Sequence, residues 1–124
     1  MTDLTFDIWQ FVRLMVHLED READGTPSAL LADWRDIWEP IDQELADLLE
    51  NDFDAYSDMM MGQFITVEEV TPELAREAAD ALAAVVTELD DLIAKAEDED
   101  EKDALTYERG ELADLRKKIL KQIR

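Results

Sequence analysis

The chain has 124 residues, no cysteine, and 33 acidic residues against 12 lysines and arginines, which gives a formal net charge of −21. This charge argues against direct contact with nucleic acid or anionic membranes and favours a basic protein surface as partner. The lack of cysteine removes disulfides, zinc-thiolate sites and thiol catalysis.

The size and hydropathy of the chain fit one folded domain over residues 1–124. Hydrophobic residues make up 47% of the sequence, enough for a real core. The longest apolar region, residues 6–18, is interrupted by polar residues and is too short to span a bilayer. We therefore expect a soluble, cytoplasmic protein without a membrane segment.

The first predicted helix starts near Leu4 and ends at Asp24-Gly25, where glycine can adopt the left-handed cap. Its apolar residues step by four and three positions, as one face of a helix requires. They are Leu4, Ile8, Phe11, Met15 and Leu18.

The polar residues of this first helix form one narrow stripe, and the rest of its surface is apolar. The helix must therefore be covered on most sides, either by the other helices of the chain or by a second copy in a homodimer. The stripe consists of Asp7, Gln10, Arg13 and His17.

Thr26-Pro27 has the pattern of a helix cap followed by a first-turn proline, so a second helix is expected there. Pro40 predicts that this helix ends near Trp38 or kinks, because proline lacks the amide donor. A third helix is expected from Ile41 to about Met61, ended by Gly62. The connector over residues 63–71 shows no convincing strand pattern.

Thr71-Pro72 repeats the helix-start pattern. The fourth helix then shows regular apolar spacing, ending in an acidic gap at residues 97–103 where we expect a turn before a helix over 105–123. One long bent helix is the alternative. The sequence thus predicts an all-α, single-domain bundle of four to five mostly antiparallel helices. The apolar residues of the fourth helix are Ala78, Leu82, Val85, Leu89, Leu92 and Ala96.

Two carboxylate pairs separated by sixteen residues carry the strongest suggestion of chemistry: Glu19 and Glu22 form E-x-x-E, and Glu39 and Asp42 form E-x-x-D. The pattern resembles the metal-binding signature of the all-α nucleoside triphosphate pyrophosphohydrolases. That resemblance implies a helical bundle in which these four carboxylates hold magnesium against substrate phosphates. Pro40 departs from it, because it interrupts the second pair. The alternative is that Glu19 and Glu22 form the solvated end of the first helix.

Other catalytic patterns are missing from the sequence. His17 is the only histidine, so a Ser-His-Asp triad around Ser28 or Ser57 and a di-iron carboxylate site are both unsupported. There is no glycine-rich phosphate loop. We therefore expect a chain that is not an enzyme and that needs no cofactor.

Two groups of large side chains could serve either the core or a partner. Trp34 and Trp38 lie one helical turn apart, and are expected either in the core or as aromatic anchors at an interface. Residues 59–61 are three consecutive methionines, which cannot all face one core in a helix.

The basic residues gather at the end of the chain. The last nine residues hold five lysines and arginines and no acid, so residues 1–115 carry 33 acids and 7 bases, a net charge of −26. Cations in the last turns of a helix interact favourably with its dipole and can pair with acids of the neighbouring helix. A separate anion-binding role is the alternative. The five residues are Arg116, Lys117, Lys118, Lys121 and Arg124.

The acidity of the body can imitate nucleic acid. A helix of about 22 residues is about 33 Å long, and duplex DNA carries about 19 charges over that length. The leading hypothesis is therefore an acidic protein-binding module, of the DNA-mimic or immunity-inhibitor type, that occludes a basic nucleic-acid-binding surface. The alternatives are a helical scaffold or adaptor and a salt-adapted bundle. Expected contact residues line one face of the third predicted helix: Asp47, Glu50, Asp54 and Asp58.

Overall fold

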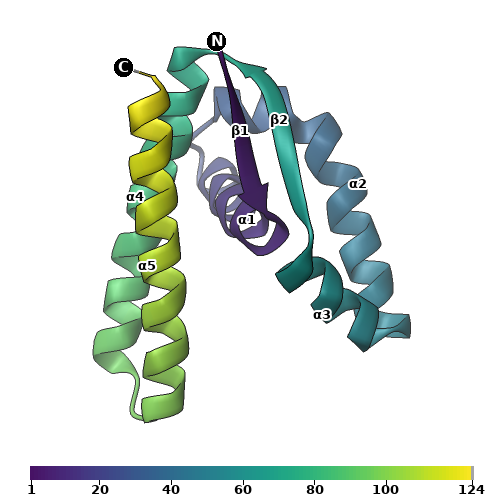
Figure 1. Cartoon of the computed structure of the whole chain (residues 1–124), viewed down its shortest axis with the longest axis vertical. Coiled ribbons are helices and arrows are strands. Elements are labelled where there is room, and N and C mark those ends of the chain that lie inside the picture. The colour runs from purple at the N-terminus through teal and green to yellow at the C-terminus, as the bar shows by residue number, and fades with distance from the viewer. Residues whose placement is uncertain (124) are drawn as a thin grey trace. The chain divides into compact units, whose positions relative to one another are not determined.

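The computed structural model describes residues 1–123, which contain five helices and one two-stranded sheet (Figure 1). Helices account for 79% of the protein, which confirms the all-α prediction with four to five helices. The chain divides into two compact units. The first is Asp3–Glu69, and the second runs from Val70 onward and includes Met1 and Thr2. That residues 1–124 form one domain stays a prediction.

The sheet was not expected from the sequence. Strand β1 (Thr2–Asp7) pairs with strand β2 (Phe64–Val70), although both segments were predicted without strand structure. The Thr5 and Thr66 hydroxyls lie 2.9 Å apart, and the Ile8 amide donates to the Gln63 carbonyl at 3.0 Å. These pairings make the two strands antiparallel.

The reason for the error lies in the spacing of the first apolar residues. Leu4, Phe6 and Ile8 are buried, while Thr5 and Asp7 between them are exposed. This alternation has the two-residue period of a strand. Leu4 and Ile8 are also four residues apart, which fits one face of a helix. The segment was therefore assigned to the first predicted helix and not to a strand.

Helix α1 (Ile8–Ala23) begins after Asp7, whose amide donates to Gln10 Oε1 at 2.9 Å. It ends as predicted at Gly25, which has a positive φ of 95°. Two residues of the predicted polar stripe, Gln10 and His17, are buried together with the apolar residues of α1. Eight of the sixteen residues of α1 are buried within one chain, and the homodimer stays a prediction.

Helix α2 (Ala29–Asn51) begins at Ser28, whose Oγ accepts from the Leu31 amide at 3.0 Å, and not at Thr26-Pro27. Of the two alternatives for Pro40, an end of the helix near Trp38 is wrong, because α2 continues through it, and a kink stays a prediction. Pro40 lies on the exposed side of the helix. The Asp36 carbonyl that loses its helical partner can therefore be hydrated, which lowers the cost of the proline.

The interruption instead falls at Asp52, which separates α2 from helix α3 (Phe53–Gly62). Asp52 has an extended backbone, with φ −155° and ψ 84°. Its Oδ1 accepts from the Ala55 amide at 3.1 Å and so caps the first turn of α3. The predicted helix from Ile41 to Met61 is thus two helices.

The core of the first unit contains an aromatic cluster. The Phe11 ring lies 5.6 Å from Phe6 and 6.0 Å from both Trp34 and Trp38, measured between ring centroids. These distances are typical of favourable aromatic pairs. A second cluster joins α1, α2 and α3 through Ile8, Leu45 and Met59.

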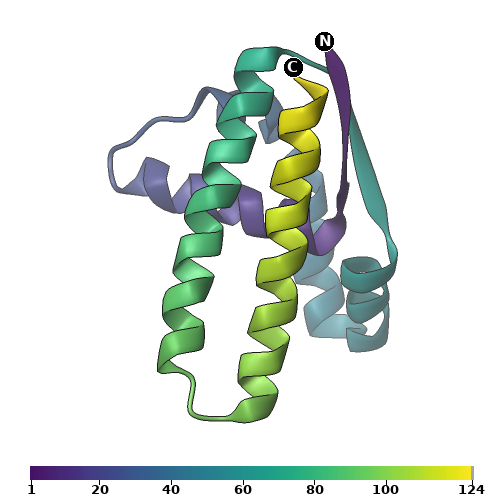
Figure 2. The same cartoon turned by 60° about the vertical axis from the view of Figure 1, so that its left-hand side comes forward.

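The second unit is a helical hairpin of α4 (Pro72–Lys95) and α5 (Glu99–Gln122), which lie side by side and antiparallel (Figure 2). Thr71 caps α4 as predicted, accepting from the Leu74 amide at 3.3 Å. The turn before Glu99 confirms two separate helices. Leu92, expected on the buried face, is instead 50% exposed near the end of α4.

Candidate functional site

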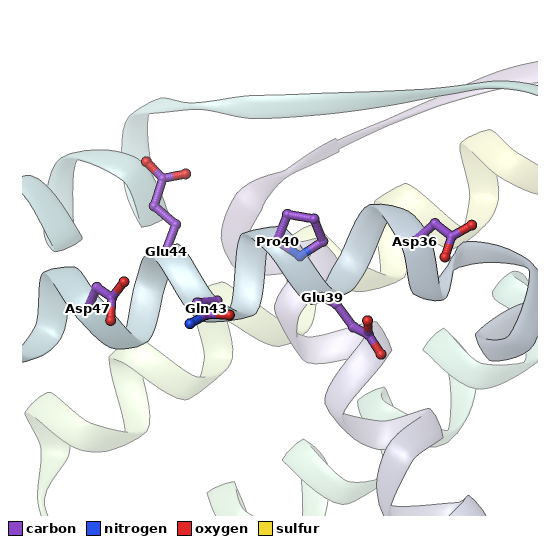
Figure 3. Close-up of a pocket in the computed structure, with 6 residues that line it drawn as sticks. All are labelled: Asp36, Glu39, Pro40, Gln43, Glu44 and Asp47. Carbon is purple, nitrogen blue, oxygen red and sulfur yellow. The ribbon is translucent and has the colours of Figure 1, made fainter.

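The most extended acidic feature of the first unit is one exposed side of α2. Because α2 continues through Pro40, residues three and four apart line up on this side over several turns. Figure 3 shows the side chains at a shallow depression on the helix. We call the acidic residues of this side the α2 face: Asp36, Glu39, Glu44, Asp47 and, one turn further, Glu50, all of them exposed.

The spacing of these charges approaches that of one DNA strand. From Asp36 to Glu50 the helix rises about 21 Å and carries the five carboxylates of the α2 face. One strand of duplex DNA carries about six phosphates over the same length. The α2 face is therefore comparable to a single phosphate track.

Few cations offset these charges: Arg35, next to Asp36 in the sequence, pairs with Glu22 and acts electrostatically on Glu39. Residues 36–69 contain eleven acidic residues and no lysine, arginine or histidine. The ion pairs Arg35–Glu22 and Arg109–Asp90 use acids outside this segment. The α2 face can therefore meet a cationic surface without first breaking these pairs.

The four acids predicted to share a helix face are divided between two helices. Asp47 and Glu50 lie on α2, and Asp54 and Asp58 lie on α3 beyond the break at Asp52. All four are exposed. Sequence reasoning missed Asp36, Glu39 and Glu44 as contact residues. Pro40 separated Asp36 and Glu39 from the predicted third helix, whereas Glu44 lay within it and was overlooked.

Trp34 and Trp38 belong to the core. Their exposed fractions are 1% and 2%, and both rings contact Phe11. Neither ring can act as an anchor for a partner without the first unit opening. Among the three consecutive methionines, Met59 is buried and Met61 is 68% exposed, as their helical positions require.

The first carboxylate pair of the metal hypothesis, Glu19 and Glu22, is bound by other groups of the protein. Glu19 accepts from the indole Nε1 of Trp38 at 3.0 Å. Both carboxylate oxygens of Glu22 accept from Arg35 Nη2 at 3.1 Å. This hydrogen bond, followed by the charge of Glu22, raises the pKa of Arg35 above its ordinary value, with smaller contributions from Glu39 and Glu19.

The guanidinium of Arg35 thus lies among three of the four candidate ligands, and Asp42 is exposed on α2. Within residues 1–123 no group of three or more His, Asp or Glu side chains is arranged to hold a metal ion. The geometry favours an ion-pair network between α1 and α2 over a magnesium centre.

Four of the five basic residues at the end of the chain lie in the last turns of α5, and Arg124 is outside the described residues. The Arg109–Asp90 ion pair, 2.8 Å between Nε and Oδ1, joins the two helices of the hairpin. With this pair aligned, residues 116–122 of α5 run beside residues 77–83 of α4. The pairing of these cations with acids of the neighbouring helix stays a prediction.

Comparisons with protein families, with curated proteins and with solved structures found no match to this chain. In the described part of the chain, no helix is long and apolar enough to cross a membrane. The case for a function therefore depends on the residues and geometry described above.

Proposed function

We propose that this protein is a non-catalytic acidic binding module that occludes a basic, nucleic-acid-binding surface of a partner protein. The observation that carries the proposal is the α2 face, five exposed carboxylates within about 21 Å of helix, where one DNA strand carries about six phosphates. A cationic groove that normally holds a DNA strand would meet a similar number of charges over a similar length.

The electrostatics of the chain support the same proposal. The net charge of −21 attracts cationic partners over long range, and the α2 face supplies local complementarity once the partners meet. Exposed charges act mainly on the association rate and on salt dependence. A DNA-mimic inhibitor needs both properties, because it must reach its target faster than nucleic acid does.

The test is capture of partners from the native host, with elution by a salt gradient and with duplex DNA as competitor. The test variant replaces four acids of the α2 face: Asp36→Asn, Glu39→Gln, Glu44→Gln and Asp47→Asn. A matched control makes the same change of charge on exposed acids of the second unit: Asp91→Asn, Glu97→Gln, Asp103→Asn and Asp114→Asn.

We expect proteins that are released by salt and displaced by DNA, and that are lost with the α2 variant but kept with the control. Equal loss with both variants would assign the binding to net charge alone. Partners that resist salt and ignore DNA would overturn the proposal and favour a scaffold or adaptor. If both variants only shift the salt range in which the protein folds, salt adaptation is the better explanation.

A further inference from the structure

Helix α3 and its two ends expose large apolar side chains in an otherwise acidic region. Their exposed fractions are 53% for Leu49, 63% for Phe53, 68% for Met61 and 70% for Phe64. Leu49 lies in the last turn of α2, and Phe64 is the first residue of β2. We call these four residues the α3 surface; α3 itself connects α2 to β2 (Figure 1).

Phe53 is the residue of the α3 surface whose support by the core is defined by its contacts. The Phe53 ring stacks on Tyr56 with 5.9 Å between centroids. Tyr56 and Met60 pack against the cluster of Ile8, Leu45 and Met59. With 3.6 residues per turn, Phe53, Tyr56 and Met60 lie on one side of α3. The exposed Phe53 ring is therefore positioned before any partner arrives.

The charges around this surface indicate what can cover it. Five acids lie on α3 or in the last turns of α2, and residues 36–69 contain no cation. A second copy of the chain would bring another −21 charges against them and would be repelled. A cationic partner gains from the same charges. The five acids are Asp47, Glu50, Asp52, Asp54 and Asp58.

We infer that the α3 surface docks a cationic amphipathic helix of a partner protein. The ten residues of α3 span about 15 Å, which matches about three turns of a partner helix with apolar residues at i, i+3 or i+4, and i+7. Flexible methionines such as Met61 adapt to such side chains. The inference rests on the proposed function and adds to it an apolar contact beside the electrostatic one.

The probe is a synthetic amphipathic helix of leucine and arginine, about 18 residues or five turns long. A scrambled peptide of the same composition keeps the charge and loses the apolar face. Binding is measured at about 0.15 M salt, where exposed charges more than about 8 Å apart are largely screened. The test variant is Phe53→Ala with Met61→Ala. The control removes exposed apolar residues of the second unit, Leu92→Ala with Tyr107→Ala.

We expect the amphipathic peptide to bind wild type at least tenfold more tightly than the scrambled one. The Phe53/Met61 variant should lose this preference, and the Leu92/Tyr107 control should keep it. Circular dichroism checks that the variants fold. Phe64→Thr is a second test variant. It replaces an exposed residue of β2 and leaves the helices untouched.

Equal binding of both peptides to wild type, unaffected by Phe53→Ala with Met61→Ala, would overturn the docking inference and leave the electrostatic proposal standing. Absence of binding by either peptide would overturn both. If light scattering finds a dimer that Phe53→Ala with Met61→Ala dissociates, a second copy occupies the surface and the inference is wrong.

Discussion

The indole Nε1 of Trp38 donates a 3.0 Å hydrogen bond to Glu19 Oε1, joining the buried face of α2 to an exposed carboxylate on α1. The indole ring is 2% exposed, so its N–H has little access to water. A carboxylate that could have served as a metal ligand instead satisfies a core donor.

This bond predicts that Glu19→Ala destabilises the protein by about 1–3 kcal/mol, because the indole N–H loses its acceptor. The measurement is urea unfolding followed by circular dichroism. Asp20→Ala, at the neighbouring exposed position, is the control and should change stability by less than about 0.5 kcal/mol. In a Trp38→Phe background the cost of Glu19→Ala should largely disappear; an unchanged cost would show that the bond does not stabilise the fold.

The Arg35–Glu22 pair leads to a prediction about magnesium. Both side chains are about half exposed, 44% and 45%, so Glu22→Gln should cost less than about 1 kcal/mol. Because Arg35 already binds Glu22 and the Trp38 indole already binds Glu19, magnesium should neither bind saturably nor raise the melting temperature. Calorimetry and assays with common and modified nucleoside triphosphates check this. Hydrolysis that Glu22→Gln abolishes would restore the pyrophosphohydrolase alternative.

Pro40 lies in the middle of α2 and predicts a stabilising substitution. Pro40→Ala restores an amide donor for the Asp36 carbonyl, which favours the helix, although it also frees the unfolded chain. We expect the free energy of unfolding to rise by about 1–2 kcal/mol, measured by urea unfolding. The opposite change is expected for Asp52→Ala, which removes the cap of α3 and should cost about 1 kcal/mol. A loss of stability on Pro40→Ala would mean that the proline fixes a bend that the core requires.

The sequence predicts correctly those helix ends that depend on a few adjacent residues and that fit no other structure. Thr71-Pro72 begins α4 and Gly25 ends α1 because capping depends on a few adjacent residues. The sheet depends on pairing between Thr5 and Thr66, which are 61 positions apart, so local spacing cannot reveal it. The prediction at Pro40 failed for another reason. The energetic cost of a proline within a helix depends on whether that side of the helix is exposed, and only the folded chain defines this.

The candidate site could be predicted only in part, because the exposure of Pro40 and the burial of the tryptophans are not visible in the sequence. Asp47 and Glu50 were identified as contact residues, but the end wrongly placed before Pro40 removed Asp36 and Glu39 from their helix. The tryptophans failed as surface anchors because aromatic spacing is the same for a core stripe and for an interface. Burial distinguishes the two, and it assigns Trp34 and Trp38 to the core.

The last prediction separates binding from salt adaptation. Neutralising four acids of the α2 face removes repulsion within a chain of net charge −21, so this variant should be more stable than wild type at low salt. The control at Asp91, Glu97, Asp103 and Asp114 removes the same charge and should also be stabilised. At 1 M salt the Debye length falls to about 3 Å, and both gains should shrink.

Thermal unfolding at low and high salt measures the gains, and partner association rates are measured on the same samples. We expect the two variants to agree in the direction of their stability change and to differ in binding, with slow association for the α2 variant alone. That pattern would mean that the α2 face keeps its charge at the expense of stability, as binding sites do. If neutralisation instead destabilises both variants at high salt and leaves association unchanged, the acids serve the fold in salt and the binding proposal fails.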